Sequence, residues 1–219
     1  MTENQELLET ILGQNVSRET FSRLETYEAL LAKWQGTINL VGPGTIPQMW
    51  ERHFLDSAQI AHLIPEGAKT LFDLGSGAGF PGMVLAILNP ALEVHLIESD
   101  QRKCAFLSTV SRETKTPVTI HNERIESLKE GAFPVPDVIT ARALAALAEL
   151  LEYALPFAQK KTALQLVFLK GAQVEKELAD ARKRFSFTVE NFPSRTDKEG
   201  AVLRLSGLCI KEGQDARKS

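Results

Sequence analysis

The sequence has few of the features that mark secreted, membrane-spanning or metal-binding proteins. It holds only two cysteines, Cys104 and Cys209, which cannot supply a disulfide framework. No apolar run approaches the roughly 18 residues of a membrane-spanning helix, and residues 1–12 lack the basic start of a signal peptide. The four histidines are scattered and share no ligand spacing with the cysteines. These absences predict a cytoplasmic globular protein with no metal site and no membrane partner.

An overall excess of positive charge is also missing. The 219 residues carry 25 Lys and Arg against 28 Asp and Glu, a net charge of −3. The molecule as a whole therefore has no electrostatic attraction for nucleic acid. Residues 160–184 nevertheless hold seven basic and three acidic groups. That stretch is either a local surface for a polyanion or, as charge alone favours, the solvated face of a helix.

What the sequence does contain is two different hydrophobic patterns. Residues 1–65 are typical of helices: Ser17 suits an N-cap, and apolar side chains from Phe21 to Trp34 recur at helical spacing up to Gly36. A further helix is predicted from Pro47 to Pro65. After residue 65, short apolar runs alternate with helical segments, which is typical of βαβ units and a parallel sheet.

Seven strands are predicted, at residues 70–74, 94–98, 118–121, 137–141, 164–169, 185–191 and 201–209. The last two are too close for a crossover helix between them, so they should form an antiparallel hairpin. The expected fold is α/β and Rossmann-like, with a seven-stranded sheet that ends in this hairpin. We expect a helical N-terminal extension at 1–65, a nucleotide-binding domain at 66–210 and a flexible tail at 211–219, in a monomer.

The strongest local motif is the glycine-rich segment that follows the first strand, Asp73-Leu-Gly-Ser-Gly-Ala-Gly-Phe-Pro-Gly82. Glycines there let the backbone approach a ligand at a helix N-terminus. The spacing of Gly77, Gly79 and Gly82 also satisfies the dinucleotide pattern G-x-G-x-x-G. On spacing alone, the segment is a dinucleotide site, an S-adenosylmethionine site or a turn without a ligand.

Two acidic residues distinguish these cofactors in part. Glu98 ends the second strand, where a carboxylate accepts hydrogen bonds from a ribose in either cofactor. Asp73 would repel the pyrophosphate of a dinucleotide, but it suits a ligand that carries an ammonium and a sulfonium group. We therefore predict cofactor contacts for Asp73, Gly77, Gly79 and Glu98.

Several separate motifs together resemble one family, the glucose-inhibited division protein B family of small-subunit (16S) ribosomal RNA guanine-N7 methyltransferases. Besides the glycine-rich segment with its Phe80-Pro81-Gly82 end, the matching segments are Asn39-Leu40, Arg52-His53-Phe54-Leu55-Asp56-Ser57, Arg124-Ile125-Glu126, Arg142-Ala143 and Leu169-Lys170-Gly171. The match covers most of the chain. The sequence departs from the family at Gln35, Val41 and Ala141, where Asn, Thr and Ser are more common.

The resemblance implies a class I S-adenosylmethionine methyltransferase that modifies one guanine N7 in the 530 loop of 16S rRNA and releases S-adenosylhomocysteine. It implies a partner in the form of this RNA or the 30S subunit. It also implies cofactor contacts at Gly75, Phe80, Ile125, Glu126 and Arg142. We place Asn39, Arg52, His53, Asp56 and Lys170 on the RNA side.

Structural interpretations of the RNA-side residues stay open beside the functional ones. Arg52 and Asp56 are spaced i,i+4 and could form a surface ion pair. His53 could be a packed core residue, and Asn39 could cap a turn. Lys170 is expected at the carboxyl edge of the sheet, near RNA phosphates.

The acceptor atom sets the expected mechanism. Guanine N7 carries an in-plane lone pair and no proton, so direct displacement at the sulfonium methyl needs no general base. Arg142 is the predicted alignment residue, in contact with O6, a phosphate or the methionine carboxylate. A small-molecule methyltransferase, a nicotinamide-dependent oxidoreductase and a non-catalytic interaction protein remain as alternatives.

Overall fold

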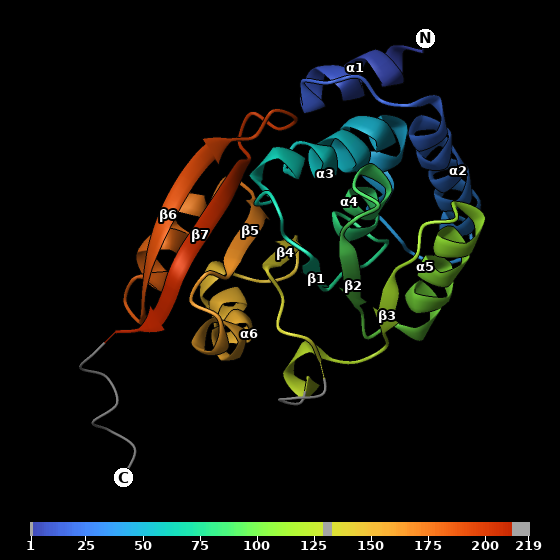
Figure 1. Cartoon of the computed structure of the whole chain (residues 1–219). Coiled ribbons are helices and arrows are strands. Elements are labelled where there is room, and N and C mark those ends of the chain that lie inside the picture. The colour runs from blue at the N-terminus through green and yellow to red at the C-terminus, as the bar shows by residue number, and fades with distance from the viewer. Residues whose placement is uncertain (1, 129–132, 212–219) are drawn as a thin grey trace.

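Seven strands form one twisted sheet in the computed structural model, which describes residues 2–128 and 133–211 (Figure 1). The strands are β1 (Thr70–Leu74), β2 (Glu93–Ile97), β3 (Thr119–His121), β4 (Val138–Arg142), β5 (Gln165–Lys170), β6 (Phe185–Pro193) and β7 (Ala201–Ile210). Their order across the sheet is β3-β2-β1-β4-β5-β7-β6. β1 to β5 run parallel, whereas β7 pairs antiparallel with both β5 and β6. The predicted seven strands and the antiparallel end are confirmed.

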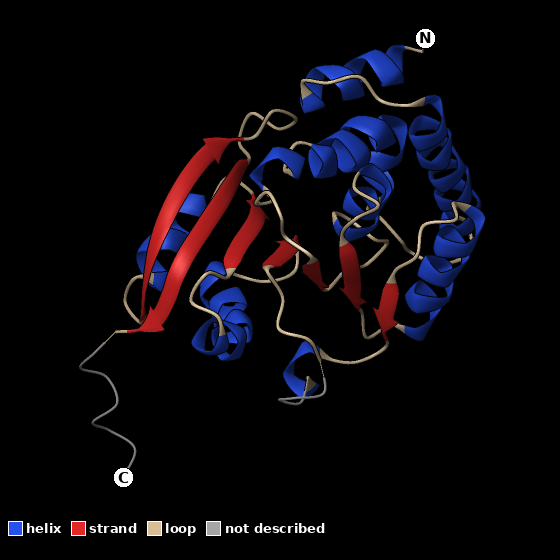
Figure 2. Ribbon diagram, in the orientation of Figure 1, coloured by secondary structure: helices blue, strands red, loops and turns tan. Residues whose placement is uncertain are grey.

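Helices cover both faces of this sheet (Figure 2). The four that follow β1, β2, β4 and β5 are α4 (Gly82–Leu88), α5 (Gln101–Glu113), α6 (Leu147–Lys160) and α7 (Val174–Ala181). The side chains of α4 and α5 belong to one hydrophobic cluster, and those of α6 and α7 to a second. The sheet therefore separates two cores, as in other doubly wound α/β folds.

The N-terminal residues pack as helices against the face that carries α4 and α5. Two regular helices, α1 (Glu3–Leu12) and α2 (Arg18–Gln35), come first. The predicted N-cap is confirmed, because the Ser17 side chain accepts a hydrogen bond from the Thr20 amide. Buried side chains of α2, among them Tyr27 and Leu31, join the same hydrophobic cluster as α4 and α5. Residues on both sides of the expected boundary at 65 and 66 thus share one core.

The continuous helix predicted from Pro47 to Pro65 is wrong. The segment is divided into a 3₁₀-helix η1 (Pro43–Gln48), a π-helix η2 (Trp50–Leu55), a short α3 (Asp56–Ala58) and a 3₁₀-helix η3 (Ala61–Leu63). In η2 the carbonyl of Arg52 accepts a hydrogen bond from the guanidinium of Arg142, at 2.8 Å. The hydrophobic periodicity of the segment could not predict this irregular turn, because Arg142, which contacts it, lies 90 positions further along the chain.

Three further expectations concern the C-terminal tail, membrane-spanning helices and metal sites. Residues 212–219 of the expected tail lie outside the described residues. Within the described ranges, no helix is long and apolar enough to cross a membrane. In the same ranges, no group of three or more His, Cys, Asp or Glu side chains is placed to hold a metal ion.

Candidate functional site

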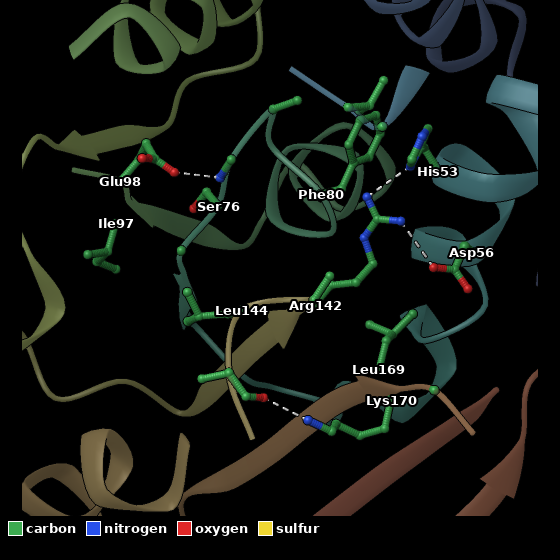
Figure 3. Close-up of a pocket in the computed structure, with 18 of the residues that line it drawn as sticks. His53, Asp56, Ser76, Phe80, Ile97, Glu98, Arg142, Leu144, Leu169 and Lys170 are labelled. Carbon is green, nitrogen blue, oxygen red and sulfur yellow. Dashed lines mark hydrogen bonds and ion pairs between the residues drawn. The ribbon is translucent and has the colours of Figure 1, made fainter. Parts of the chain in front are cut away.

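A cavity of about 1020 Å³ opens at the carboxyl edge of the parallel strands. Its walls come from the loops that follow β1 to β5, from the segment around η1 and η2, and from the loop between β6 and β7. Ligands bind at this edge in open α/β sheets. Figure 3 shows Glu98 on one side of this cavity and His53, Asp56 and Arg142 on the other.

The glycine-rich loop forms the floor of the side that carries Glu98. Gly75 and Gly77 both adopt positive φ angles, +62° and +58°, which side chains rarely permit. One carboxylate oxygen of Glu98 accepts the Gly77 amide at 2.8 Å, and the other accepts the Asp100 amide at 2.8 Å. Glu98 is itself buried. Its position at the end of β2 thus fixes the loop as well as lining the cavity.

Asp73 and Gly79 lie behind the loop and do not line the cavity. The Asp73 carboxylate is fully buried and accepts hydrogen bonds from the Gly82 amide at 3.1 Å and the Thr140 hydroxyl at 2.8 Å. Burial raises the pKa of Asp73 to about 6. A Cβ atom on Gly79 would lie 2.6 Å from the Tyr27 hydroxyl. Both residues support the loop from beneath, whereas the sequence predicted cofactor contacts for Asp73 and Gly79 alike.

Arg142, the last residue of β4, links the sheet to the N-terminal helices (Figure 3). One terminal nitrogen donates to the carbonyl of Arg52 at 2.8 Å and to Asp56 at 3.3 Å, and the other donates to His53 at 3.0 Å. The guanidinium also lies over the Phe80 ring, 5.1 Å from its centroid. A planar donor group held in this way has little freedom to turn.

The contact with Arg142 fixes the protonation of His53. A guanidinium only donates, so Nδ1 of His53 must accept, and the ring proton is on Nε2. Nε2 then donates to the Thr45 hydroxyl at 2.8 Å, which donates to the Gly42 carbonyl at 2.7 Å. Burial, with the charges of Arg142 and Arg52, lowers the pKa of His53 to about 3. His53 is therefore neutral at physiological pH, and it is both packed and part of the cavity wall.

The i,i+4 ion pair between Arg52 and Asp56 does not form. Arg52 pairs with Asp197 in the loop between β6 and β7, at 2.8 Å. Asp56 pairs with Arg142 and accepts a hydrogen bond from the Thr196 hydroxyl at 2.7 Å. The π-helix changes the angular spacing of these side chains, so a rule for regular α-helices fails here.

The basic stretch 160–184 does not gather at the cavity. Among its basic residues only Lys170 lines the wall, where it pairs with Glu177 at 2.6 Å and donates to the Ala145 carbonyl at 2.8 Å. Lys161 pairs with Asp137, which precedes β4 and thus lies at the opposite edge of the sheet. Asn39 is exposed and is not part of the cavity wall.

Comparison with known proteins decides the family. The profile of the family described as rRNA small subunit methyltransferase G matches residues 20–201. The chain belongs to the rRNA small subunit methyltransferase G family. This confirms the resemblance seen in the sequence motifs.

Individual relatives of this family are similar over nearly the whole chain. The ribosomal RNA small subunit methyltransferase G of Parvibaculum lavamentivorans is 50% identical over 207 residues, which cover 93% of this chain and 90% of that protein. The protein of the same name from Rhodospirillum rubrum is 53% identical over 193 residues, or 88% of this chain and 93% of that one.

Solved structures show the same fold at low identity. The ribosomal protein L11 methylase from Lactobacillus delbrueckii subsp. bulgaricus has a TM-score of 0.54 and 18% identity, over 71% of this chain and 78% of that one. A chain of a fibrillarin/Nop5p complex has a TM-score of 0.52 and 13% identity, over 65% of this chain and 74% of that one. At such identities the likeness establishes the Rossmann-like fold alone.

Ile125 and Glu126, in η4 (Ile125–Ser127), line the cavity as the resemblance implied. Glu126 accepts a hydrogen bond from the Tyr153 hydroxyl at 3.0 Å.

Two residues of the cavity wall were not predicted from the sequence, Tyr153 on α6 and Leu144 after β4. Leu144 covers Gly75, since a Cβ there would lie 2.5 Å from its side chain. The Arg142-Ala143 motif was the only nearby signal.

Proposed function

We propose that this family member transfers a methyl group from S-adenosylmethionine to N7 of a guanine in the 530 loop of 16S rRNA. The observation that carries the proposal is one cavity that joins two half-sites, the glycine-rich loop with Glu98 and the Arg142 cluster. The names of the relatives support a ribosomal RNA substrate. The sequence motifs support N7 and the 530 loop. We expect a cytoplasmic monomer acting on the RNA or the 30S subunit.

The residues around the cavity fit S-adenosylmethionine. Gly77 leaves room for close approach to the backbone, and the backbone of Gly75 lies beside it under the Leu144 side chain. Each oxygen of Glu98 has one backbone partner, so it retains acceptor capacity for a ribose hydroxyl. Phe80 and Ile125 offer apolar surface in the same wall. The cofactor would thus be held by Gly75, Gly77, Phe80, Glu98, Ile125, Glu126 and Arg142.

The Arg142 side chain also fits S-adenosylmethionine. Its Nε–H is buried and has no hydrogen-bond partner among the described residues. An unpartnered buried donor costs about 1–3 kcal/mol. A carboxylate bound beside Arg142 would supply an acceptor, and S-adenosylmethionine carries one.

This reaction requires the protein to align the two reactants, and it requires no proton transfer. S-adenosylmethionine, when bound, supplies a methyl group on a positively charged sulfur. Guanine N7 has no proton to lose, and His53, the histidine in the wall, is held neutral and turned towards Arg142. Arg142 and Phe80 therefore act as positioning groups, and alignment of this kind contributes up to about 7–11 kcal/mol.

The acceptor half of the cavity offers polar and charged side chains to a substrate. Arg52, His53, Asp56 and Lys170 line it, and the cavity is open at the sheet edge. Asn39 would reach RNA only outside the cavity. A small-molecule acceptor remains the alternative function.

The test uses labelled S-adenosylmethionine and small ribosomal subunits from cells that lack this gene. We expect one methyl group in the 530 loop, mapped by primer extension after borohydride reduction and aniline cleavage of the RNA. Methylation of free nucleotides or metabolites without transfer to RNA would favour the alternative. Failure to bind S-adenosylhomocysteine, together with a response to a nicotinamide cofactor, would overturn the cofactor assignment.

A further inference from the structure

The acceptor side of the cavity is closed by the loop from Ser194 to Gly200, between β6 and β7. A buried glutamine, Gln59, holds this loop: its carbonyl oxygen accepts the Arg195 amide at 2.8 Å, and its nitrogen donates to the Ser194 hydroxyl at 3.2 Å. Thr196 donates to Asp56 at 2.7 Å. These contacts fix the loop to the helices independently of the Asp197 side chain.

Asp197 and Arg52 form an ion pair on the wall of the cavity. Their atoms Oδ2 and Nη1 are 2.8 Å apart, and their side chains are 37% and 40% exposed. The other oxygen of Asp197 accepts only the Glu199 amide. The remaining N–H groups of Arg52 have no hydrogen-bond partner among residues 2–128 and 133–211. Each partner thus keeps hydrogen-bonding capacity that a ligand can use.

The other carboxylates on this side are more fully engaged. Asp56 accepts hydrogen bonds from Arg142, Gln59 and Thr196. One oxygen of Glu177 already holds Lys170 and the Leu147 amide. Asp197 is also more exposed than either of them, whose side chains are 17% and 22% exposed. It is therefore the carboxylate best placed to meet an incoming base.

We propose that the Arg52–Asp197 pair selects guanine by donating to O6 and accepting from N1–H of the acceptor base. This inference rests on the proposed function and names the residues that would decide its base specificity. It assigns Asp197, which no sequence motif had indicated, to the substrate side of the site.

The chemistry of the base edges explains the choice. In guanine the acceptor O6 stands beside the donor N1–H, and an arginine beside a carboxylate presents the matching donor and acceptor. Adenine has the opposite order, with an amino group at position 6 and an acceptor at N1. The arginine would then meet a second donor, and the carboxylate a second acceptor. Unpaired bases in RNA are read on this edge. Reading there also leaves N7 free to react.

The test measures discrimination rather than activity alone. Subunits are assembled with either guanine or 2-aminopurine at the methylated position; 2-aminopurine keeps N7 but lacks O6 and N1–H. Wild type should prefer guanine by about 10- to 100-fold in kcat/KM. Asp197→Ala should lose rate on guanine and reduce the preference to within a few fold. A purely structural role would lower both rates equally, and an unchanged preference would overturn the inference.

Two further variants make the result specific. Asp197→Asn keeps the size of the side chain but replaces one acceptor by a donor, and it should also reduce the preference. Glu190→Ala removes an exposed carboxylate that pairs with Arg204 at 2.6 Å on the same hairpin, outside the cavity wall. It should keep the wild-type preference.

The readouts separate this inference from the proposed function. Affinity for S-adenosylhomocysteine, measured by calorimetry, should be the same in wild type and in Asp197→Ala. If wild type does not methylate the guanine subunit, the proposed function fails. If wild type does so and Asp197→Ala keeps its preference, only the role of Asp197 fails.

Discussion

Arg142 connects two segments that lie far apart in the sequence. Its replacement tests whether methyl transfer depends on the alignment of the reactants by this side chain. Arg142→Ala would leave Nδ1 of His53 without its donor and would remove one of the three donors to Asp56. Loss of one positioned donor typically costs about 100- to 1000-fold in rate. We expect a loss of this order in single-turnover methylation. Arg142→Lys should recover little, because an ammonium cannot reach several partners in one plane. Full activity in either variant would contradict this role.

His53 gives a prediction about pH and stability. Its pKa is lowered to about 3 in the folded chain, from 6.5. Between these values the unfolded chain binds more protons, so this residue stabilises the fold fully above pH 6.5, and that contribution falls as the pH falls towards 3. We expect His53→Gln to lose less stability than wild type between pH 6.5 and 4 in urea unfolding. Equal losses would contradict the buried neutral state.

Asp73 acts in the opposite direction over an overlapping range. Burial raises its pKa to about 6 from 3.8, so the folded chain binds more protons there, and its contribution to stability falls as pH rises from 3.8 to 6. The comparison of wild type with His53→Gln therefore isolates His53, whereas the wild-type curve alone does not.

At the scale of elements, the turn from β1 to α4 depends on the absence of a side chain at Gly82. A Cβ there would lie 2.6 Å from Leu96 and 2.7 Å from the Cβ of Asp73. Overpacking of this kind costs about 1–3 kcal/mol. Gly82→Ala should lower the free energy of unfolding by this amount and weaken cofactor binding in calorimetry. Gly44→Ala, which meets nothing within 4 Å, is the control and should change neither.

The sequence predicted regular elements well and irregular ones badly. Strand β1 and helix α2 follow from local hydrophobic spacing, because each buries one continuous set of side chains. The π-helix at Trp50–Leu55 does not, since it accompanies a contact with Arg142 on β4. Hydrophobic spacing between neighbouring residues cannot predict an irregular helical turn when the residue that contacts it is remote in the sequence.

The same distinction holds within the site. Gly77 and Glu98 could be placed from the loop motif and the strand end, because short-range backbone geometry carries them to the cavity. Gly75 and Phe80 lie in the same loop and were placed through the family resemblance. Asp197 and Tyr153 arrive through tertiary packing from other elements, so no local signal exposes them. Asp73 had the right position in the chain but points beneath the loop, a matter of side-chain packing.

At the scale of the whole molecule, the N-terminal helices and the sheet share one core. The cluster that holds Leu24 and Trp50 also holds Val84 and Leu96. We therefore expect a single cooperative unfolding transition. The two tryptophans, Trp34 and Trp50, both lie in residues 1–65, so their fluorescence reports the surroundings of this N-terminal segment. Urea curves from fluorescence and from far-UV circular dichroism should coincide. Two separate midpoints would show that the extension unfolds independently.

In the proposed reaction, this cavity directs a methyl group to guanine N7 without a general base. The most direct measurement is mass spectrometry of nucleosides from small subunits that the wild-type protein has methylated in vitro. We expect N7-methylguanosine as the sole new nucleoside. A methyl group on a base nitrogen that must first lose a proton, or on a ribose 2′-oxygen, would contradict the proposed mechanism, because either product requires a general base.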